Sequence, residues 1–456
     1  MPLHNDEPCL LDALDRGALV QEVGRAVATC TPPQVFGIHG DWGLGKTSFL
    51  HQLHFHLVGH CPQQADDQVT AAKNAGPGGR YSKSVRVVWF EAWRYQHERA
   101  PVVALLHEIR SQLAWHLKAL NQLKKTVSVA VRGALLSMED LTKEIGFQAS
   151  KIEKAGEQWE REHLAARLPS HTIREQLTRA IDGVLSAGFS SRPKDLRLVV
   201  IIDDLDRCDP EGAYRLLEGL KIYLTLPNCV FVLGMNQRIV EDAIAKQIPI
   251  PEKQENLRPE RAAAYLEKLC QNVWRLPAVA DPKRHLIELL PPTIARNWID
   301  AALGAQTCLP PNPRRIKGMA NLLQRFAERH LPHDGAPDDA DIIQRARLIF
   351  IVAYVYQFHH DLYRLWEINP ALFDHIRDWV RSVGPAQASP ISPLFDRLRR
   401  AVLVQTDERA PTPVWSVTTA FPDPSESNVF WIQALIHELG HDVTAESFRP
   451  YLRGQA

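Results

Sequence analysis

The sequence predicts an α/β fold: a parallel sheet flanked by helices, with a helical insertion and a mainly α-helical C-terminal region. Three observations support this prediction. Short apolar runs without alternation are typical of parallel strands that are buried on both faces. Segments with helical periodicity separate these runs. Two of the runs end in residues suited to binding phosphate and metal, and open α/β sheets bind ligands at such strand ends.

The first of these strand ends is the stretch Gly40–Ser48, which directly follows the apolar run 35–39. Two glycines frame four residues and precede a lysine and a hydroxyl residue, which is the phosphate-binding loop pattern. The glycines let backbone N–H groups turn toward phosphate oxygens, and the helix that follows adds its positive N-terminus. We expect Lys46 to reach the β- and γ-phosphates and Thr47 to bind Mg²⁺. The nucleotide-binding residues expected here are Gly40, Asp41, Trp42, Gly43, Leu44, Gly45, Lys46, Thr47 and Ser48.

The second strand end carries a pair of aspartates, Asp203 and Asp204, after the apolar run 198–202. We expect Asp203 to hold Mg²⁺, directly or through water, and Asp204 to polarise the attacking water. A solvated turn is the alternative for the aspartates, and an isolated match to the loop pattern also occurs by chance. Both motifs in this order, each after a strand, predict a nucleotide-hydrolysing core of the P-loop NTPase type.

Composition limits the classes of protein to which the chain can belong. With 456 residues, 45% hydrophobic and 23% charged, it can form about two or three globular domains. Lys+Arg and Asp+Glu are equal at 53 each, so no overall field favours nucleic acid or an anionic membrane. The seven cysteines form no C-x-x-C pair, which indicates a reducing compartment. With no signal peptide pattern and no apolar run of roughly 18–20 residues, we expect a cytoplasmic protein without a transmembrane segment.

The N-terminal half is expected to alternate helices and strands. Residues 9–30 predict a helix, and the polar stretch 59–84 predicts a loop or mobile excursion. A strand follows at 85–90. The aromatic residues after it either simply cap the sheet edge or, at this strand end, leave Glu91 able to approach the γ-phosphate or its water. A helix is expected from Pro101.

Residues 118–167 form the predicted helical insertion, which is rich in Lys, Glu and Gln. It is either an amphipathic segment that binds the core or a partner, or an ordinary surface hairpin. Another helix is predicted at 171–185, before the aspartate strand.

After the aspartates we expect a helix over 210–224 and a buried strand over 229–235. Asn236, at the end of that strand, can orient water beside the γ-phosphate, cap the next helix at 239–246, or do both.

From Pro259 onward the chain is expected to be helical, including helices at 292–303, 313–330 and 342–366 and a last one around 428–439. Arg314 and Arg315 lie in the first turn of one of these helices, where cations oppose the helix dipole. An anionic partner such as a nucleotide phosphate would explain them, and pairing with acidic side chains elsewhere is the alternative.

Near the end, His437, Glu438 and His441 match the H-E-x-x-H zinc-protease pattern. A catalytic zinc needs a third ligand, only a short tail follows, and Gly440 weakens the helix. We therefore expect surface histidines rather than a zinc site.

Several stretches together resemble the KAP family of P-loop NTPases, over roughly Asp12 to Phe326. They are Gly40–Ser48, Phe90–Tyr95, Ile202–Cys208, Tyr265–Lys268, Trp274–Pro277 and Asn312–Lys317. The resemblance implies a switch-like ATPase of the STAND type, found in bacteria and sometimes linked to defence against phage. Many members insert transmembrane helices where this chain has the soluble-looking insertion 118–167. The family often has an aspartate where this chain has Asn236.

The predicted organisation is an NTPase core at 1–117 and 168–258, the insertion at 118–167, a helical lid at 259–385 and an extension at 386–456. We expect a Mg²⁺-dependent NTPase that acts as a nucleotide-driven conformational switch, with ATP favoured by the resemblance. A protein partner or a second copy is expected to bind through the helical regions. The predicted catalytic residues are Lys46, Asp204, Asn236, Arg207 and Arg315, with Arg207, Arg314 and Arg315 as candidates for a charge-stabilising arginine.

Two other functions remain in view. The first is a nucleotide-gated scaffold that hardly turns over. The second is a DNA-dependent motor, which the neutral charge and the lack of a basic, aromatic-interleaved stretch disfavour.

Overall fold

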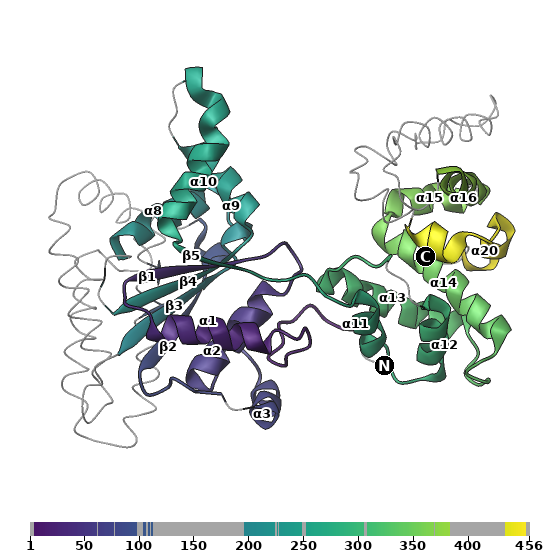
Figure 1. The fold of residues 1–456 in the computed structure, drawn as a ribbon, viewed down its shortest axis with the longest axis horizontal. Helices are drawn as coiled ribbons and strands as arrows, with labels where there is room; N and C mark the ends of the chain where they lie inside the picture. Colours follow the sequence, from purple (N-terminus) through teal and green to yellow (C-terminus); the bar gives the residue numbers. More distant parts are fainter. Residues whose placement is uncertain are drawn as a thin grey trace. The chain divides into compact units, whose positions relative to one another are not determined.

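A computed structural model describes residues 4–97 except 62 and 77, 104–105, 108–109, 111–112, 196–248 except 224, 225 and 227, 252–304, 308–368, 370–383 and 434–452. The chain divides into two compact units (Figure 1). The first, Glu7–Pro277, contains the sheet, and we call it the sheet unit. The second, Met1–Asp6 with Ala278–Ala456, is called the helical unit.

Five parallel strands of the described residues form the sheet, in the order β2-β3-β4-β1-β5. Their bounds are β1 Gln34–His39, β2 Val85–Glu91, β3 Arg197–Asp203, β4 Cys229–Met235 and β5 Asn272–Arg275. The first four confirm the predicted strands, and the parallel α/β fold is confirmed with them. Because β4 lies between β1 and β3, the two motif-bearing strands are two strand spacings apart, about 10 Å.

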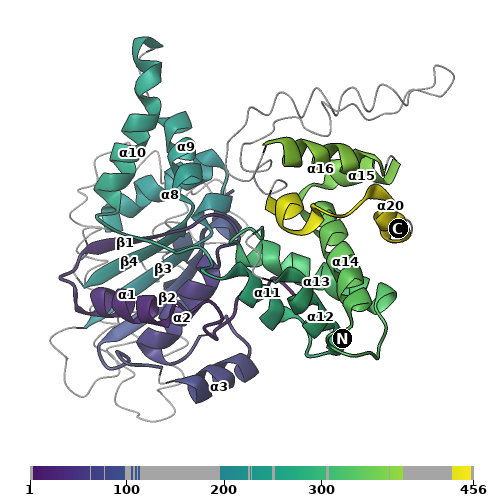
Figure 2. The ribbon, with the colours of Figure 1, turned by 45° about the vertical axis from the view of Figure 1, so that its right-hand side comes forward.

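Helices cover both faces of this sheet (Figures 1 and 2). On one face lie α1 (Gly17–Thr29) and α2 (Lys46–Val58). On the other lie α8 (Pro210–Tyr223), α9 (Gln237–Gln247) and α10 (Arg258–Leu269). Alternate side chains of β3 contact opposite layers, so Val199 and Ile201 pack with α1 and α2 while Val200 and Ile202 pack with α8–α10. This two-sided burial explains why the strand is apolar throughout.

Three segments of the sheet unit differ from the prediction. The predicted helix 9–30 begins only at Gly17, and the carboxylate of Asp12 accepts the N–H groups of Arg16 and Gly17 at 2.8 and 2.6 Å where it begins. The expected loop 59–84 contains helix α3 (Asp66–Ala75), which buries Ala72 in a small apolar cluster. The third difference is β5, which lies in the region expected to be helical from Pro259 and pairs with β1.

The strand β5 also bears on the boundary between the predicted core and lid. The core was expected to end at 258, whereas the sheet extends to β5 and the sheet unit ends at Pro277. The sequence pattern missed the strand because β5 has only four residues, Asn272 to Arg275, with alternating intermediate and exposed burial. Short edge strands of this kind carry little apolar signal.

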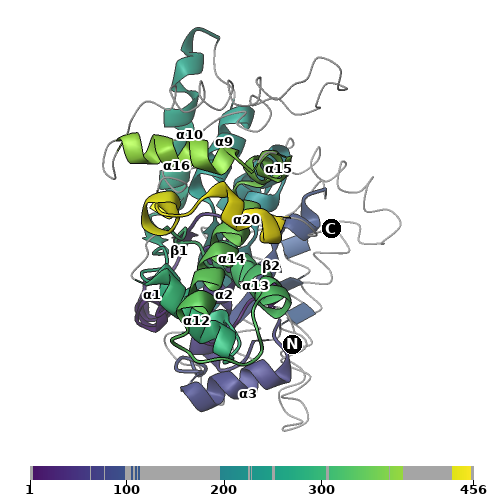
Figure 3. The ribbon, with the colours of Figure 1, turned by 90° about the vertical axis from the view of Figure 1, so that its right-hand side faces the viewer.

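The helical unit is built around α14 (Ala340–Phe358). Every residue from 348 to 355 is buried, so this helix is surrounded by others over its C-terminal half. The surrounding helices are α11 (Pro282–Leu289), α12 (Ile294–Leu303), α13 (Pro313–His330), α15 (His360–Ile368), α16 (Leu372–Val383) and α20 (Ala445–Leu452). Figure 3 shows α20 beside α14 and α16. The helices predicted at 292–303, 313–330 and 342–366 are confirmed, the last divided at His359 into α14 and α15.

Some predictions fall on residues outside those described. They are the insertion 118–167, the helix 171–185 and most of the extension 386–456. Among the residues that the structure does describe, no helix combines the length and apolar character needed to cross a bilayer.

Candidate nucleotide-binding site

The phosphate loop connects β1 to α2, as the sequence predicts. Gly43 and Gly45 both have φ of +81°, in the left-handed region that glycine adopts without strain. Gly45 is the N-cap of α2, so the free N–H groups of the first helical turn point into the loop. The loop therefore has the curled backbone that anion binding requires.

Lys46 lies across the inside of this loop. Its ammonium donates to the carbonyls of Gly40 and Asp41 at 2.8 and 3.4 Å and pairs with Asp206 at 3.2 Å. The side chain of Lys46 is only 8% exposed, and that of Asp206 only 1%. Asp206 also accepts the indole N–H of Trp42 at 3.1 Å. An acidic side chain that the sequence did not single out thus holds the lysine and the third residue of the loop.

Asp203 ends β3 beside Thr47. The Thr47 hydroxyl lies close enough to the Asp203 carboxylate to act against the rise of its pKa, so the two expected metal ligands are neighbours. Asp203 is almost fully buried, and burial together with the neighbouring Asp204 carboxylate raises its pKa to about 7. The raised pKa reflects first the burial of this carboxylate and then the charge of Asp204, and a bound cation would oppose both effects.

Asp204 adopts a left-handed backbone conformation, with φ of +59°, before the short turn Leu205–Arg207. Its carboxylate pairs with the Arg207 guanidinium at 2.8 Å. Burial raises its pKa, while Arg207 acts in the opposite direction. The two predicted catalytic residues are therefore in contact with each other in this structure.

Asn236 caps helix α9, which is one of the two roles expected for it. Its side-chain oxygen accepts the N–H of Arg238 at 3.1 Å at the start of α9. Its amide group donates to the Asp41 carboxylate of the phosphate loop at 3.2 Å. Asn236 therefore connects the phosphate loop with α9, which lies on the face of the sheet opposite to α2.

Other loop residues meet the segment that precedes α1. The Ser48 hydroxyl accepts the N–H of Cys9 at 3.1 Å. The buried guanidinium of Arg16 donates to the carbonyls of Leu44 and Pro277, both at 2.5 Å. Arg16 thus joins the loop to the end of the sheet unit.

The residues present suit a magnesium ion. Asp203 and Asp206 each have one buried carboxylate oxygen, Oδ1, without a hydrogen-bond partner among the described residues. A buried carboxylate oxygen without a partner raises the free energy of the fold unless a cation or a water molecule binds to it. Carboxylate and hydroxyl oxygens are the ligands that Mg²⁺ prefers, so Thr47 and Asp203 can hold the ion.

The other two candidate arginines lie in the helical unit, on α13. Arg314 pairs with Asp6 at 2.7 Å, which is the alternative considered for it, and Arg315 lies 4.9 Å from the centre of the Phe358 ring. Their role toward a nucleotide remains a prediction.

The H-E-x-x-H match lies on a π-helical turn, Ile436–Gly440. His437 and His441 are exposed, as expected of surface histidines, and their ring centres are 6.5 Å apart. Within the described part of the chain, no three His, Cys, Asp or Glu side chains are grouped closely enough to hold a metal.

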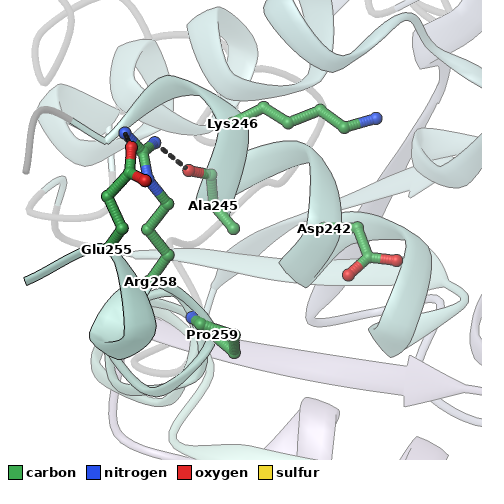
Figure 4. Close-up of a pocket in the computed structure, with 6 residues that line it drawn as sticks. All are labelled: Asp242, Ala245, Lys246, Glu255, Arg258 and Pro259. Atoms are coloured by element: carbon green, nitrogen blue, oxygen red, sulfur yellow. Dashed lines mark hydrogen bonds and ion pairs between the residues drawn. The ribbon is translucent and has the colours of Figure 1, made fainter. Parts of the chain in front are cut away.

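A cavity of about 410 Å³ lies elsewhere in the sheet unit, between α9 and α10 (Figure 4). Its walls include Arg258, which donates to the Ala245 carbonyl at 3.0 Å and pairs with Glu255 at 3.6 Å. None of its six lining residues belongs to the phosphate loop or to the aspartate strand end.

Comparison with protein families gives one decisive match. The model of the KAP family P-loop domain matches residues 20–284, which is more than half of the chain and includes all the described strands. The chain belongs to the KAP family of P-loop NTPases. A comparison with curated proteins found no match.

Membership of the KAP family identifies the loop at Gly40–Ser48 as part of a nucleotide-binding domain. Of the predicted site residues in this KAP domain, the structure brings Lys46, Thr47, Asp203, Asp204, Asn236 and Arg207 to one edge of the sheet. Sequence reasoning missed Asp206 and Arg16. Asp206 lies in the short turn Leu205–Arg207 directly after the aspartate strand end, and this closeness in sequence is the signal that could have revealed it. No local sequence signal marks Arg16.

Proposed function

We propose that this KAP protein is a Mg²⁺-dependent nucleoside triphosphatase, with ATP as its substrate, that works as a nucleotide-driven conformational switch. The observation that carries the proposal is the meeting of Lys46, Thr47 and Asp203 at one edge of the sheet. The preference for ATP and a setting in bacterial signalling or defence against phage follow from family resemblance.

Transfer of a phosphoryl group to water depends mainly on positioning and charge neutralisation. The loop amides and Lys46 would bind the β- and γ-phosphates, and Thr47 with Asp203 would hold Mg²⁺, which supplies charge neutralisation when bound. Asp204 would orient the attacking water. Arg207 is the candidate arginine already at the site, and it would have to leave Asp204 to stabilise the developing charge.

The switch is supported by Asn236, which contacts both the phosphate loop and the first turn of α9. A change at the loop on nucleotide binding would alter the hydrogen bond to Asp41 and so reach α9.

The test combines calorimetry of Mg-ATP binding with steady-state turnover, for wild type, Lys46→Ala and Asp204→Asn. We expect Lys46→Ala to lose nucleotide binding, since it removes the phosphate-binding cation. Asp204→Asn should bind ATP but turn over about 100-fold more slowly. Lys246→Ala, a lysine on α9 away from the loop, serves as the control. Turnover of Asp204→Asn at the wild-type rate would refute the role given to Asp204.

One observation favours a second candidate, a nucleotide-gated scaffold with little turnover. The carboxylate that must orient water is held by Arg207 at 2.8 Å. A single burst of product without a sustained rate would support the scaffold. Light scattering without nucleotide, with ADP and with a non-hydrolysable ATP analogue would show whether nucleotide changes the oligomeric state in either case.

A further inference from the structure

Asp206 occupies a place in the site that none of the roles above explains. Its Oδ2 pairs with the Lys46 ammonium and accepts the Trp42 indole N–H at 3.1 Å. Its Oδ1 is buried and has no hydrogen-bond partner among the described residues. One carboxylate thus neutralises the lysine with one oxygen and leaves the other oxygen unsatisfied.

The position of Trp42 makes this arrangement sensitive to a nucleotide. Trp42 is the third residue of the phosphate loop, and this residue is 57% exposed although its indole N–H donates to Asp206. Phosphates entering the loop would compete with Asp206 for the ammonium of Lys46, because a lysine paired with a carboxylate has fewer N–H groups left for them. They would also bring negative charge close to the Asp206 carboxylate.

We propose that Asp206 is a positioning residue that holds Lys46 and Trp42 until a magnesium nucleotide enters. The phosphates then take over Lys46, and the released carboxylate faces the metal-binding side chains Asp203 and Thr47. Asp206 therefore makes the site distinguish nucleotide with Mg²⁺ from nucleotide without it, because its charge repels phosphates that carry no cation. This inference rests on the proposed function, since it requires that the loop binds Mg-nucleotide.

The experiment measures the ratio of ADP affinities with Mg²⁺ and with EDTA, by calorimetry on the full-length chain. Asp206→Asn removes the charge and keeps an oxygen that can accept from Trp42. We expect this variant to bind metal-free ADP about tenfold more tightly than wild type, so that the ratio shrinks about tenfold. Asp206→Glu keeps the charge and should keep most of the ratio. A residue that only maintains the fold would change both affinities together and leave the ratio unaltered.

Asp242→Asn is the matched control, since it removes the same charge from an exposed residue of α9 and should leave the ratio unchanged. If circular dichroism shows that Asp206→Asn does not fold, the ratio of ADP affinities is measured instead on Asp206→Ser, which removes the same charge. An unchanged ratio in a folded, charge-removing variant overturns the inference while the proposed function stands. A wild-type chain that binds ADP under neither condition overturns the proposed function and the inference with it.

Discussion

At the scale of single residues, the sheet unit buries titratable groups both at the site and away from it. Asp203 carries a pKa raised to about 7, chiefly by burial, at the candidate metal position. His51 on α2 shows the opposite case, because burial lowers its pKa to about 4. Its ring packs on Trp89 at 4.4 Å between centres, and its Nδ1 meets the Gln64 amide at 2.6 Å. The fold therefore keeps His51 neutral.

This burial gives a pH dependence with a definite sign. The pKa of His51 is about 4 in the folded chain and about 6.5 in the unfolded chain, so the unfolded state binds the proton first. The contribution of His51 to stability is full above pH 6.5 and is lost as the pH falls toward 4. We expect the free energy of unfolding to drop by about 2 kcal/mol between pH 7 and pH 5 through this group.

Urea unfolding of wild type and His51→Gln at both pH values checks this expectation. The variant should lose about that much of the pH dependence. His97→Gln, in which the replaced side chain is 85% exposed, is the control. Equal pH dependence in wild type and His51→Gln would contradict the assignment.

At the scale of elements, β4 is the strand on which the site is assembled. It separates β1 from β3, and its last residues reach both motifs. Asn236 follows it and contacts the phosphate loop. Gly234 lies beside Asp203, where an added Cβ would be 2.9 Å from the aspartate Oδ1 and 2.5 Å from Leu50. The absence of a side chain at this position lets α2 and Asp203, the candidate metal ligand, approach the strand.

We expect Gly234→Ala to weaken Mg-nucleotide binding and to lower the free energy of unfolding by about 1–3 kcal/mol, since the added Cβ would overlap with Leu50 and Asp203. Calorimetry and urea unfolding measure the two effects. Gly76→Ala is a suitable control, because an added Cβ there meets nothing within 4 Å. Wild-type affinity in Gly234→Ala would show that Asp203 can move without loss of binding.

At the scale of the whole molecule, the first residues belong to the helical unit although the next ones enter the sheet unit. His4 and Asn321 exchange two hydrogen bonds of 2.7 and 2.8 Å on α13. Asp6 pairs with Arg314, and the Asn5 carbonyl accepts from Lys317 at 3.1 Å. The N-terminus therefore stabilises the helical unit rather than the nucleotide-binding unit.

Deleting residues 1–6 should lower the stability of the helical unit by about 1–3 kcal/mol, since several exposed hydrogen bonds of modest strength are lost. In scanning calorimetry, Mg-nucleotide should raise the unfolding temperature of the sheet unit, and the deletion should lower the unfolding temperature of the helical unit. Arg314→Gln removes one exposed ion pair and should cost less than 1 kcal/mol. If the deletion instead lowered the unfolding temperature that nucleotide raises, the assignment of residues 1–6 to the helical unit would be contradicted.

The sequence by itself determined the parallel α/β fold, four of the strands, the phosphate loop and the aspartate strand end. These features are local: a run buried on both faces, or a loop of fixed spacing, leaves its pattern in consecutive residues. Only the tertiary structure decided that β4 lies between the motif strands, that β5 completes the sheet, and that Arg16 and Asp206 contact the loop and Lys46. Strand order and long-range ion pairs depend on which surfaces meet after folding. A local sequence pattern does not show which distant residues will come into contact.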